Sequence, residues 1–269
     1  MTRLRIAVAG ASGKMGRTVV RAIAESQDST LAAAFVRAAH EDIGADAGVV
    51  AGARPLSIAL TEASAPGLAG AHAVVDFTIP AASLALLGLS ANAHVAHVIG
   101  TTGFSSEQEE QIAAFARETV VIKSGNMSLG VTLLAALLKQ AARALPDFDI
   151  EILEMHHRAK VDAPSGTALL LGAAAADGRN VSLPDNSITA RDRRRGPRKE
   201  GVIGFASLRG GTVIGEHEVI LAGPQERVIL SHVAEDRMIF ARGALAAAHW
   251  AQGRPNGLYS MAAVLGLAA

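Results

Sequence analysis

The sequence predicts an α/β fold in which a domain with a parallel sheet is combined with an α+β domain whose sheet is mostly antiparallel. Two observations indicate the first domain: a glycine-rich turn links the first apolar strand to a helix, and strands alternate with helices as far as Leu145. A third observation indicates the second domain, because the chain from Ile203 onward is dense in β-forming residues and turns.

Composition excludes several classes of protein. The 269 residues include 25 basic and 25 acidic side chains, and this balance argues against a nucleic-acid partner. The absence of cysteine excludes disulfides and thiol catalysis. No apolar run reaches the ~20 residues of a membrane helix, and the run near the N-terminus is too short for a signal peptide. We expect a cytoplasmic protein with no membrane partner.

The N-terminal segment is predicted to form a βαβ unit. Arg5–Ala9 and Thr30–Val36 are apolar strands, and residues 17–26 between them have helical spacing.

Three glycines connect this first strand to its helix. Gly10, Gly13 and Gly16 have the spacing G-x-x-G-x-x-G. Glycines permit a tight turn and let the backbone approach a pyrophosphate, which then lies at the positive N-terminus of the helix. Such a turn also serves simple strand-to-helix packing, but its place in a βαβ unit favours nucleotide binding. The sequence therefore predicts a Rossmann-type dinucleotide-binding domain.

The end of the second strand bears on which nucleotide binds. An acidic residue is expected there to hold the ribose of NAD, yet the sequence has Phe35, Val36 and Arg37. Arg37 stands where a 2′-phosphate would lie, although an ordinary solvated arginine is the alternative. Lys14 and Arg17 in and after the glycine turn favour the phosphate. We therefore predict that NADPH is preferred and that NADH is also used.

Three more strands are predicted at Ala73–Thr78, His94–Ile99 and Val120–Lys123. The last two end in small polar turns at 100–103 and 124–128, and the carboxyl ends of parallel strands form one ligand-binding edge. Residues 105–118 form a predicted helix with Ser105 or Ser106 as its N-cap.

The second domain begins after Pro146 with an extended segment at Asp149–Met155. Arg209–Gly211 and Gly223–Gln225 are predicted hairpin connections between its later strands. The basic run at 191–199 has the charge to bind anions, but its glycine and proline favour a solvated loop. Alanine-rich stretches near 173–176 and 244–248 are predicted helices.

The segment EMHHRAKVDAPSGTALLLG, at 154–172, has the highest density of candidate catalytic side chains. His156 and Lys160 would be about 13 Å apart on an extended chain. They can belong to one site only if the loop between them folds back. Ser165 is a good N-cap, and the amides of Gly166 and Thr167 offer a carboxylate site. A metal site lacks further ligands at suitable spacing, and a capped polar loop leaves the histidine pair unexplained.

HHRAKVDAPSGTA resembles the motif of the 4-hydroxy-tetrahydrodipicolinate reductase (dihydrodipicolinate reductase) family. The resemblance extends through GASGKMGR, VVDFTIP, VIGTTGFS, SGNMSLGV, IGFASLRGGTVIGEHEV and FARGALAAAHWAQGRPNGLYSM. It implies a dinucleotide-binding domain at 1–127 and 237–269, and a substrate-binding and oligomerisation domain at 128–236. It also implies a homotetramer.

The implied reaction is the reduction of 4-hydroxy-tetrahydrodipicolinate, a cyclic dicarboxylate, to tetrahydrodipicolinate in diaminopimelate and lysine biosynthesis. By resemblance, His156 donates or accepts a proton, Lys160 donates one, and no metal takes part. Val36 departs from the family, in which many members carry an acid there. The remaining implied contacts are with substrate at His157, Ser165, Gly166 and Thr167, and with cofactor at Gly10, Ala11, Ser12, Gly13, Lys14, Met15, Gly100, Thr101, Thr102, Ser124, Gly125, Asn126 and Met127. Arg37 is added to the cofactor contacts from its position after the second strand.

Two other functions compete with this one. A semialdehyde or homoserine dehydrogenase has the same architecture, although the lack of cysteine excludes the thiol-acylating kind. A nucleotide sensor without enzyme activity would be expected to lose the His156 and Lys160 pair, which is present here.

Overall fold

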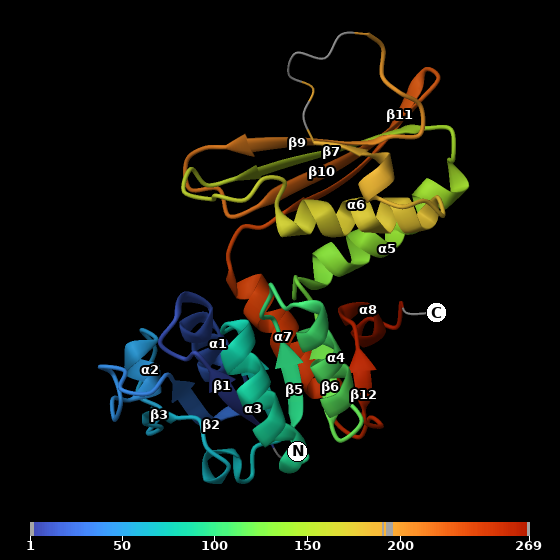
Figure 1. The fold of residues 1–269 in the computed structure, drawn as a ribbon. Coiled ribbons are helices and arrows are strands. Elements are labelled where there is room, and N and C mark those ends of the chain that lie inside the picture. Colours follow the sequence, from blue (N-terminus) through green and yellow to red (C-terminus); the bar gives the residue numbers. More distant parts are fainter. Residues whose placement is uncertain (1–2, 190, 192–195, 268–269) are drawn as a thin grey trace. The chain divides into compact units, whose positions relative to one another are not determined.

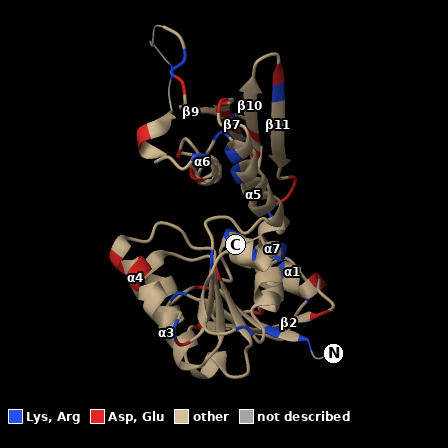
Figure 2. Cartoon of the chain, turned by 90° about the vertical axis from the view of Figure 1, so that its right-hand side faces the viewer, with Lys and Arg blue, Asp and Glu red and all other residues tan. Residues whose placement is uncertain are grey.

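The computed structural model describes residues 3–189, 191 and 196–267, and the chain forms two compact units (Figure 1). Unit 1 comprises Met1–Leu129 and Arg237–Ala269, and unit 2 comprises Gly130–Asp236. Figure 2 shows acidic and basic residues intermixed along both units, as the zero net charge suggests. No helix in the described ranges is long and apolar enough to cross a membrane.

Unit 1 is built on a seven-stranded sheet in the order β12-β6-β5-β4-β1-β2-β3, and all of its ladders are parallel, as predicted. The short strands β3 and β12 were not predicted, because each has three residues and lacks a buried apolar run. The strands are β1 (Leu4–Ala9), β2 (Ser29–Val36), β3 (Leu60–Glu62), β4 (Ala73–Asp76), β5 (Ala96–Ile99), β6 (Val120–Lys123) and β12 (Gly257–Tyr259).

Helices cover both faces of this sheet. Ile6 and Val8 of β1 pack with α1 and α7, whereas Ala7 and Ala9 pack on the opposite face with α3. This alternation follows from the two-residue period of a strand. The helical segments of unit 1 are α1 (Lys14–Glu25), α2 (Ala47–Val50), η1 (Pro66–Leu68), α3 (Pro80–Asn92), α4 (Ser106–Phe115), α7 (Met238–Trp250) and α8 (Met261–Val264).

Local side-chain chemistry sets several boundaries. Ser105 caps α4, where its hydroxyl and Gln108 form a capping box, as one of the two predicted caps. β5 begins two residues later than predicted, because His94 has a left-handed φ of 52° and lies in a turn. β4 ends two residues earlier, because the Asp76 carboxylate accepts hydrogen bonds from the Thr78 amide and hydroxyl.

Unit 2 has a five-stranded sheet in the order β11-β10-β7-β9-β8, with α5 and α6 packed on one face (Figure 1). The sheet is mixed: β10 pairs antiparallel with β11 and β7, and β9 pairs parallel with β7 and β8. The bounds are α5 (Leu129–Ala144), β7 (Asp149–His156), α6 (Gly166–Gly178), η2 (Pro184–Asn186), β8 (Ser187–Ile188), β9 (Ile203–Arg209), β10 (Glu216–Gly223) and β11 (Glu226–Val233).

One predicted hairpin is confirmed and the other is wrong. Pro224 and Gln225 join β10 to its antiparallel neighbour β11, and Gln225 has the positive φ of a type II turn. Arg209–Gly211 does not close a hairpin, because β7 lies between β9 and β10 and pairs with both. The pairing of β7 with both β9 and β10, and not the local turn sequence, therefore determines how these strands are arranged.

The basic run is only partly a solvated loop. Arg191 and Arg198 form ion pairs with Glu151 of β7, at 2.5 Å and 2.9 Å, and Arg198 also binds Asp149 at 2.6 Å. Residues 192–195 of this run lie outside the described residues. Arg191 and Arg198 therefore anchor the segment between β8 and β9 to β7.

Candidate active site

The glycine turn of unit 1 lies at the carboxyl edge of the parallel sheet. Gly10 has a left-handed φ of 64°, and a Cβ on Gly16 would collide with the Gly10 carbonyl. Both positions therefore require glycine. Gly13 is the N-cap of α1 and has no side-chain cap, so the first turn of the helix, which includes Lys14 and Met15, presents its amide end at this edge.

A cavity of about 560 Å³ opens beside this turn. Gly10, Ser12, Gly13 and Arg37 line it, so the structure brings these predicted residues together. Its remaining walls are largely apolar and include Val36, Phe77 and Leu86. An apolar slot next to an uncapped helix start suits a base and a pyrophosphate.

Glu62 also lines this cavity, and sequence reasoning missed it. It ends β3 and stands in register with Val36 of β2, and it accepts a 3.4 Å hydrogen bond from the Ala39 amide. His40 lies close by, with Nε2 3.1 Å from the Ser12 hydroxyl. No local pattern indicates Glu62, because β3 is a three-residue edge strand.

The other predicted cofactor segments follow β5 and β6 at the same edge. Gly100 and Thr102 flank Thr101, whose buried hydroxyl accepts a 3.0 Å hydrogen bond from the Thr78 amide. After β6, the Ser124 hydroxyl donates to the Asn126 carbonyl at 2.7 Å, next to the exposed Gly125.

Two predicted cofactor residues have their side chains elsewhere. Met127 and Ala11 are each 1% exposed and belong to the core of unit 1.

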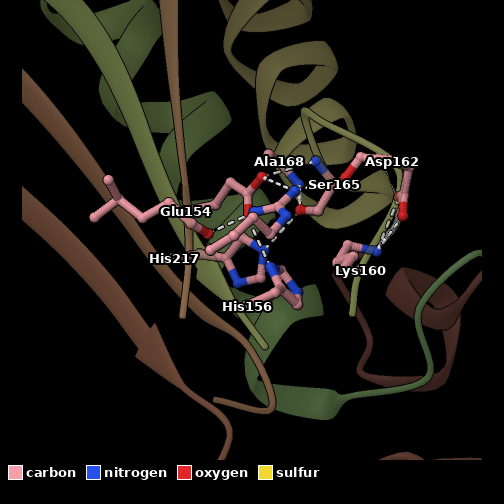
Figure 3. A network of polar contacts seen from close by, with 9 residues as sticks. Glu154, His156, Lys160, Asp162, Ser165, Ala168 and His217 are labelled. Atoms are coloured by element: carbon pink, nitrogen blue, oxygen red, sulfur yellow. Dashed lines mark hydrogen bonds and ion pairs between the residues drawn. The ribbon is translucent and has the colours of Figure 1, made fainter. Parts of the chain in front are cut away.

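In unit 2, a buried polar cluster surrounds the end of β7 (Figure 3). His156 is 8% exposed and Glu154 is 1% exposed, on the same face of the strand. The His156 Nδ1 lies 2.6 Å from the Glu154 Oε2. Arg209 of β9 donates to both oxygens of Glu154 at 2.8 Å, and the Ser165 amide donates to Oε1 at 3.2 Å.

Lys160 lies on a turn that leads away from β7. The Lys160 amide donates to the His157 carbonyl at 3.1 Å, so the chain curls back as one site requires. The Lys160 ammonium lies 2.7 Å from Asp162, to the side of the histidine cluster in Figure 3. A compact loop therefore carries His157, Lys160 and Asp162.

The start of α6 completes this cluster. Ser165 is its N-cap, as predicted, and its hydroxyl accepts from the Ala168 amide at 3.1 Å. The same hydroxyl lies 3.1 Å from Nε2 of His217 on β10. A Cβ added at Gly166 would meet nothing within 4 Å, so the backbone there is open to a ligand. Thr167 follows in the first turn.

The charges of the cluster are set by burial and by Arg209. Burial alone would raise the pKa of Glu154, but hydrogen bonds from Arg209, Ser207 and His156 lower it to about 2. Burial lowers the pKa of His217 to about 4, with a further contribution from His156, so His217 is neutral. Burial also lowers the pKa of His156, against the opposing effect of Glu154.

Sequence reasoning missed Glu154, Arg209 and His217. Glu154 was detectable, because the two-residue period places it on the same face as His156. Arg209 and His217 come from β9 and β10, and only the sheet order brings them to His156. In the described parts of the chain, no group of three His, Cys, Asp or Glu side chains could hold a metal ion.

A sheet edge of the dinucleotide-binding type in one unit and a buried cluster of histidine, glutamate and arginine in the other are typical of an oxidoreductase that uses a nucleotide cofactor. Residues 4–127 match the family model described as "Dihydrodipicolinate reductase, N-terminus", and residues 130–265 match "Dihydrodipicolinate reductase, C-terminus". The chain therefore belongs to the dihydrodipicolinate reductase family, as its motifs suggested.

Relatives and a solved structure agree with this membership. The chain is 58% identical to a 4-hydroxy-tetrahydrodipicolinate reductase of Brucella abortus (strain 2308), over 97% of this chain and 98% of the relative. It is 56% identical to the enzyme of the same name from Methylocella silvestris, over 99% and 98%. The dipicolinate-bound dihydrodipicolinate reductase from Paenisporosarcina sp. TG-14 superimposes with a TM-score of 0.76 at 25% identity, over 96% and 98%.

Proposed function

We propose that this chain reduces 4-hydroxy-tetrahydrodipicolinate to tetrahydrodipicolinate with a nicotinamide nucleotide, as a step of diaminopimelate and lysine biosynthesis. The observation that carries the proposal is the cluster at the end of β7, where His156, Lys160 and the open start of α6 occur together in a member of this family.

The substrate chemistry explains what the cluster has to do. The ring is a cyclic imine with two carboxylates, and loss of its hydroxyl as water leaves a conjugated C=C–C=N system. The nicotinamide, when bound, supplies the hydride that reduces this system at the far ring carbon. Electron density then moves to the ring nitrogen, which takes a proton. Cationic or proton-donating groups near that nitrogen lower the barrier, and we assign this task to His156 and Lys160.

The start of α6 is suited to hold a ring carboxylate. An anion is stabilised by amide groups at a helix N-terminus, and Gly166 leaves open space there. We assign carboxylate binding to Gly166 and Thr167, with His157 as a further substrate contact. Ser165 stabilises the helix start that carries Gly166 and Thr167 by capping the helix.

The cofactor contacts belong to unit 1. The glycine turn fits a pyrophosphate, because Gly10 and Gly16 are positions where a side chain cannot be placed. Arg37 and Lys14 are cations that can bind a 2′-phosphate, which favours NADPH. Glu62 in the same cavity has the opposite tendency, since a carboxylate accepts ribose hydroxyl hydrogen bonds and repels phosphate. We therefore propose preference for NADPH with residual use of NADH.

We further propose the roles of the two parts of the chain. Residues 1–127 and 237–269 bind the dinucleotide, and residues 128–236 bind substrate and associate into a homotetramer. Exposed apolar side chains on the second sheet support an association surface. Ile229 and Val233 of β11 are 53% and 58% exposed, and Leu208 of β9 is 48% exposed.

The proposal is tested by identifying the product. The chain is incubated with freshly made synthase product and NADPH, and the ring compounds are analysed by mass spectrometry. We expect a product that has lost the hydroxyl oxygen and kept both carboxylates. Recovery of unreduced ring compounds only, together with turnover of aspartate semialdehyde, would instead favour a homoserine-type dehydrogenase.

A further inference from the structure

The contact between Glu154 and His156 points to a role for a residue outside the predicted site. The two side chains lie two positions apart on β7, and the 2.6 Å separation of Oε2 and Nδ1 is short, as in a charge-assisted hydrogen bond. We propose that Glu154 is a positioning residue that keeps a proton on Nδ1 of His156 and thereby leaves Nε2 as the atom that exchanges a proton with the substrate. The link to substrate rests on the proposed function.

The carboxylate of Glu154 is fully used as an acceptor. Oε2 accepts from His156 Nδ1 and from Arg209, Oε1 accepts from Arg209 and from the Ser165 amide, and the Ser207 side chain also donates to this carboxylate. A carboxylate that is 1% exposed persists as an anion only when it is paired and hydrogen-bonded in this way. Because an ionised carboxylate has no proton to donate, the imidazole must carry the proton on Nδ1.

Arg209 is itself held in place. Besides Glu154, its guanidinium donates to the carbonyl oxygens of Leu208 and Asp162. The second of these contacts ties the Lys160 loop to the same anion. Glu154 therefore connects three elements: β7, β9 and the loop that precedes α6.

The surroundings of Nε2 are also specific. A Cβ on Gly215 would come within 3.0 Å of Nε2, so glycine at this position keeps space beside the reactive atom. The His217 ring meets the His156 ring edge-on, with centroids 5.2 Å apart. Since His217 is neutral, it adds no charge that would compete for Glu154.

The charged groups around His156 give the sign of a pH effect. Burial lowers its pKa most, Glu154 raises it, and Lys160 and Arg209 lower it. His217 faces it from β10, and Asp162 pairs with Lys160 rather than with the imidazole. Glu154 is thus the group that favours the imidazolium. Neutralising Glu154 therefore lowers the pKa of His156. As the pH rises, activity that requires protonated His156 is then lost at a lower pH in the variant than in the wild type.

Glu154→Gln changes the tautomer as well. Glutamine has one acceptor oxygen, which the Ser165 amide and Arg209 both require at the Oε1 position. Its NH₂ group then takes the place of Oε2, where it faces the second Arg209 donor as well as Nδ1. Nδ1 becomes the acceptor of this NH₂ group, and the neutral imidazole carries its proton on Nε2. A histidine in the wrong tautomer cannot accept a proton at Nε2.

The test combines histidine NMR with kinetics. Nitrogen-15 spectra of the wild type, with His156 assigned through His156→Gln, are expected to show protonated Nδ1, and Glu154→Gln is expected to show protonated Nε2. We expect Glu154→Gln to lower kcat by about 10- to 100-fold, to change KM little, and to move the high-pH loss of kcat to lower pH. Glu151→Gln is the matched control, because it removes an arginine-paired carboxylate from the opposite face of β7.

The outcomes separate the two claims. A wild-type His156 protonated on Nε2, or a kcat–pH profile of Glu154→Gln that coincides with that of Glu151→Gln, would overturn the inference. The spectra need no substrate, so the expected tautomer in a chain that fails to reduce the ring would reject the proposed function alone. If Glu154→Gln does not fold, the nitrogen-15 spectra of the wild type and of Arg209→Lys decide the question. Arg209→Lys keeps a cation beside Glu154, so both spectra should show the proton on Nδ1 of His156, and a proton on Nε2 would overturn the inference.

Discussion

Replacing Arg209 by Met is expected to destabilise unit 2 through a single buried charge. Met keeps much of the volume of the side chain but donates no hydrogen bond, so Glu154 loses both of its guanidinium contacts. The pKa of Glu154 is about 2 against an ordinary 4.5. Since a pKa difference of one corresponds to about 1.4 kcal/mol, ionised Glu154 contributes about 3 kcal/mol at neutral pH. Arg209→Met should forfeit most of this, in line with the ~3–5 kcal/mol lost when a buried ion pair is broken.

The pH dependence has a definite sign. A carboxyl whose pKa is lowered by folding contributes its full stability above its unfolded pKa, here 4.5, and loses it as the pH falls towards 2. The difference between wild type and Arg209→Met should therefore be largest at neutral pH and shrink steadily below pH 4.5.

Hydrogen exchange of the β7 and β9 amides is the suitable assay, because the single Trp250 lies in unit 1 and does not report on this sheet. Arg191→Met is the control, since it removes an arginine from an ion pair whose side chains are 45% and 28% exposed. Such a pair is worth about 1 kcal/mol or less. Equal opening free energies for the two variants at neutral pH would refute the argument.

Three further predictions concern activity. His156→Ala and Lys160→Ala should each lower kcat by about 10²–10⁴-fold while nucleotide binding, measured by fluorescence titration, is retained; near-normal turnover in both would remove their assignment. Thr167→Val should raise the substrate KM more than it lowers kcat, and an unchanged KM would leave Thr167 as a helix-start residue only. Arg37→Ala should weaken the binding of NADPH by about tenfold with little effect on the binding of NADH. Glu62→Gln should weaken the binding of NADH more than that of NADPH. Equal losses for the two nucleotides in titrations of both variants would show that neither residue distinguishes them.

Much of unit 1 was predictable because its signals are local. The turn around Gly10 and the cap at Ser105 each depend on residues within a few positions of one another, and the same holds for the cap at Ser165 in unit 2. The apolar runs predicted at Arg5–Ala9, Thr30–Val36 and Val120–Lys123 coincide with largely buried strands for the same reason.

The errors lie where distant residues decide the outcome. The Arg209–Gly211 turn has hairpin chemistry, but β7 occupies the space between β9 and β10. The same sheet order brings Arg209 and His217 to His156 from 53 and 61 positions further along the chain. Glu62 reaches the cofactor cavity only through the register of β3 with β2. Such pairings are tertiary, so no local pattern contains them.

The most direct test of the account is the rate of NADPH oxidation by the purified wild-type chain when the ring substrate is generated in the cuvette by its synthase. We expect oxidation that depends on the synthase, consumes one nucleotide for each ring reduced, and falls by about 10²-fold or more in His156→Ala. Oxidation that proceeds without the synthase, or that is unchanged in His156→Ala, would contradict the claim that the cluster at the end of β7 assists the reduction of this ring by the nucleotide.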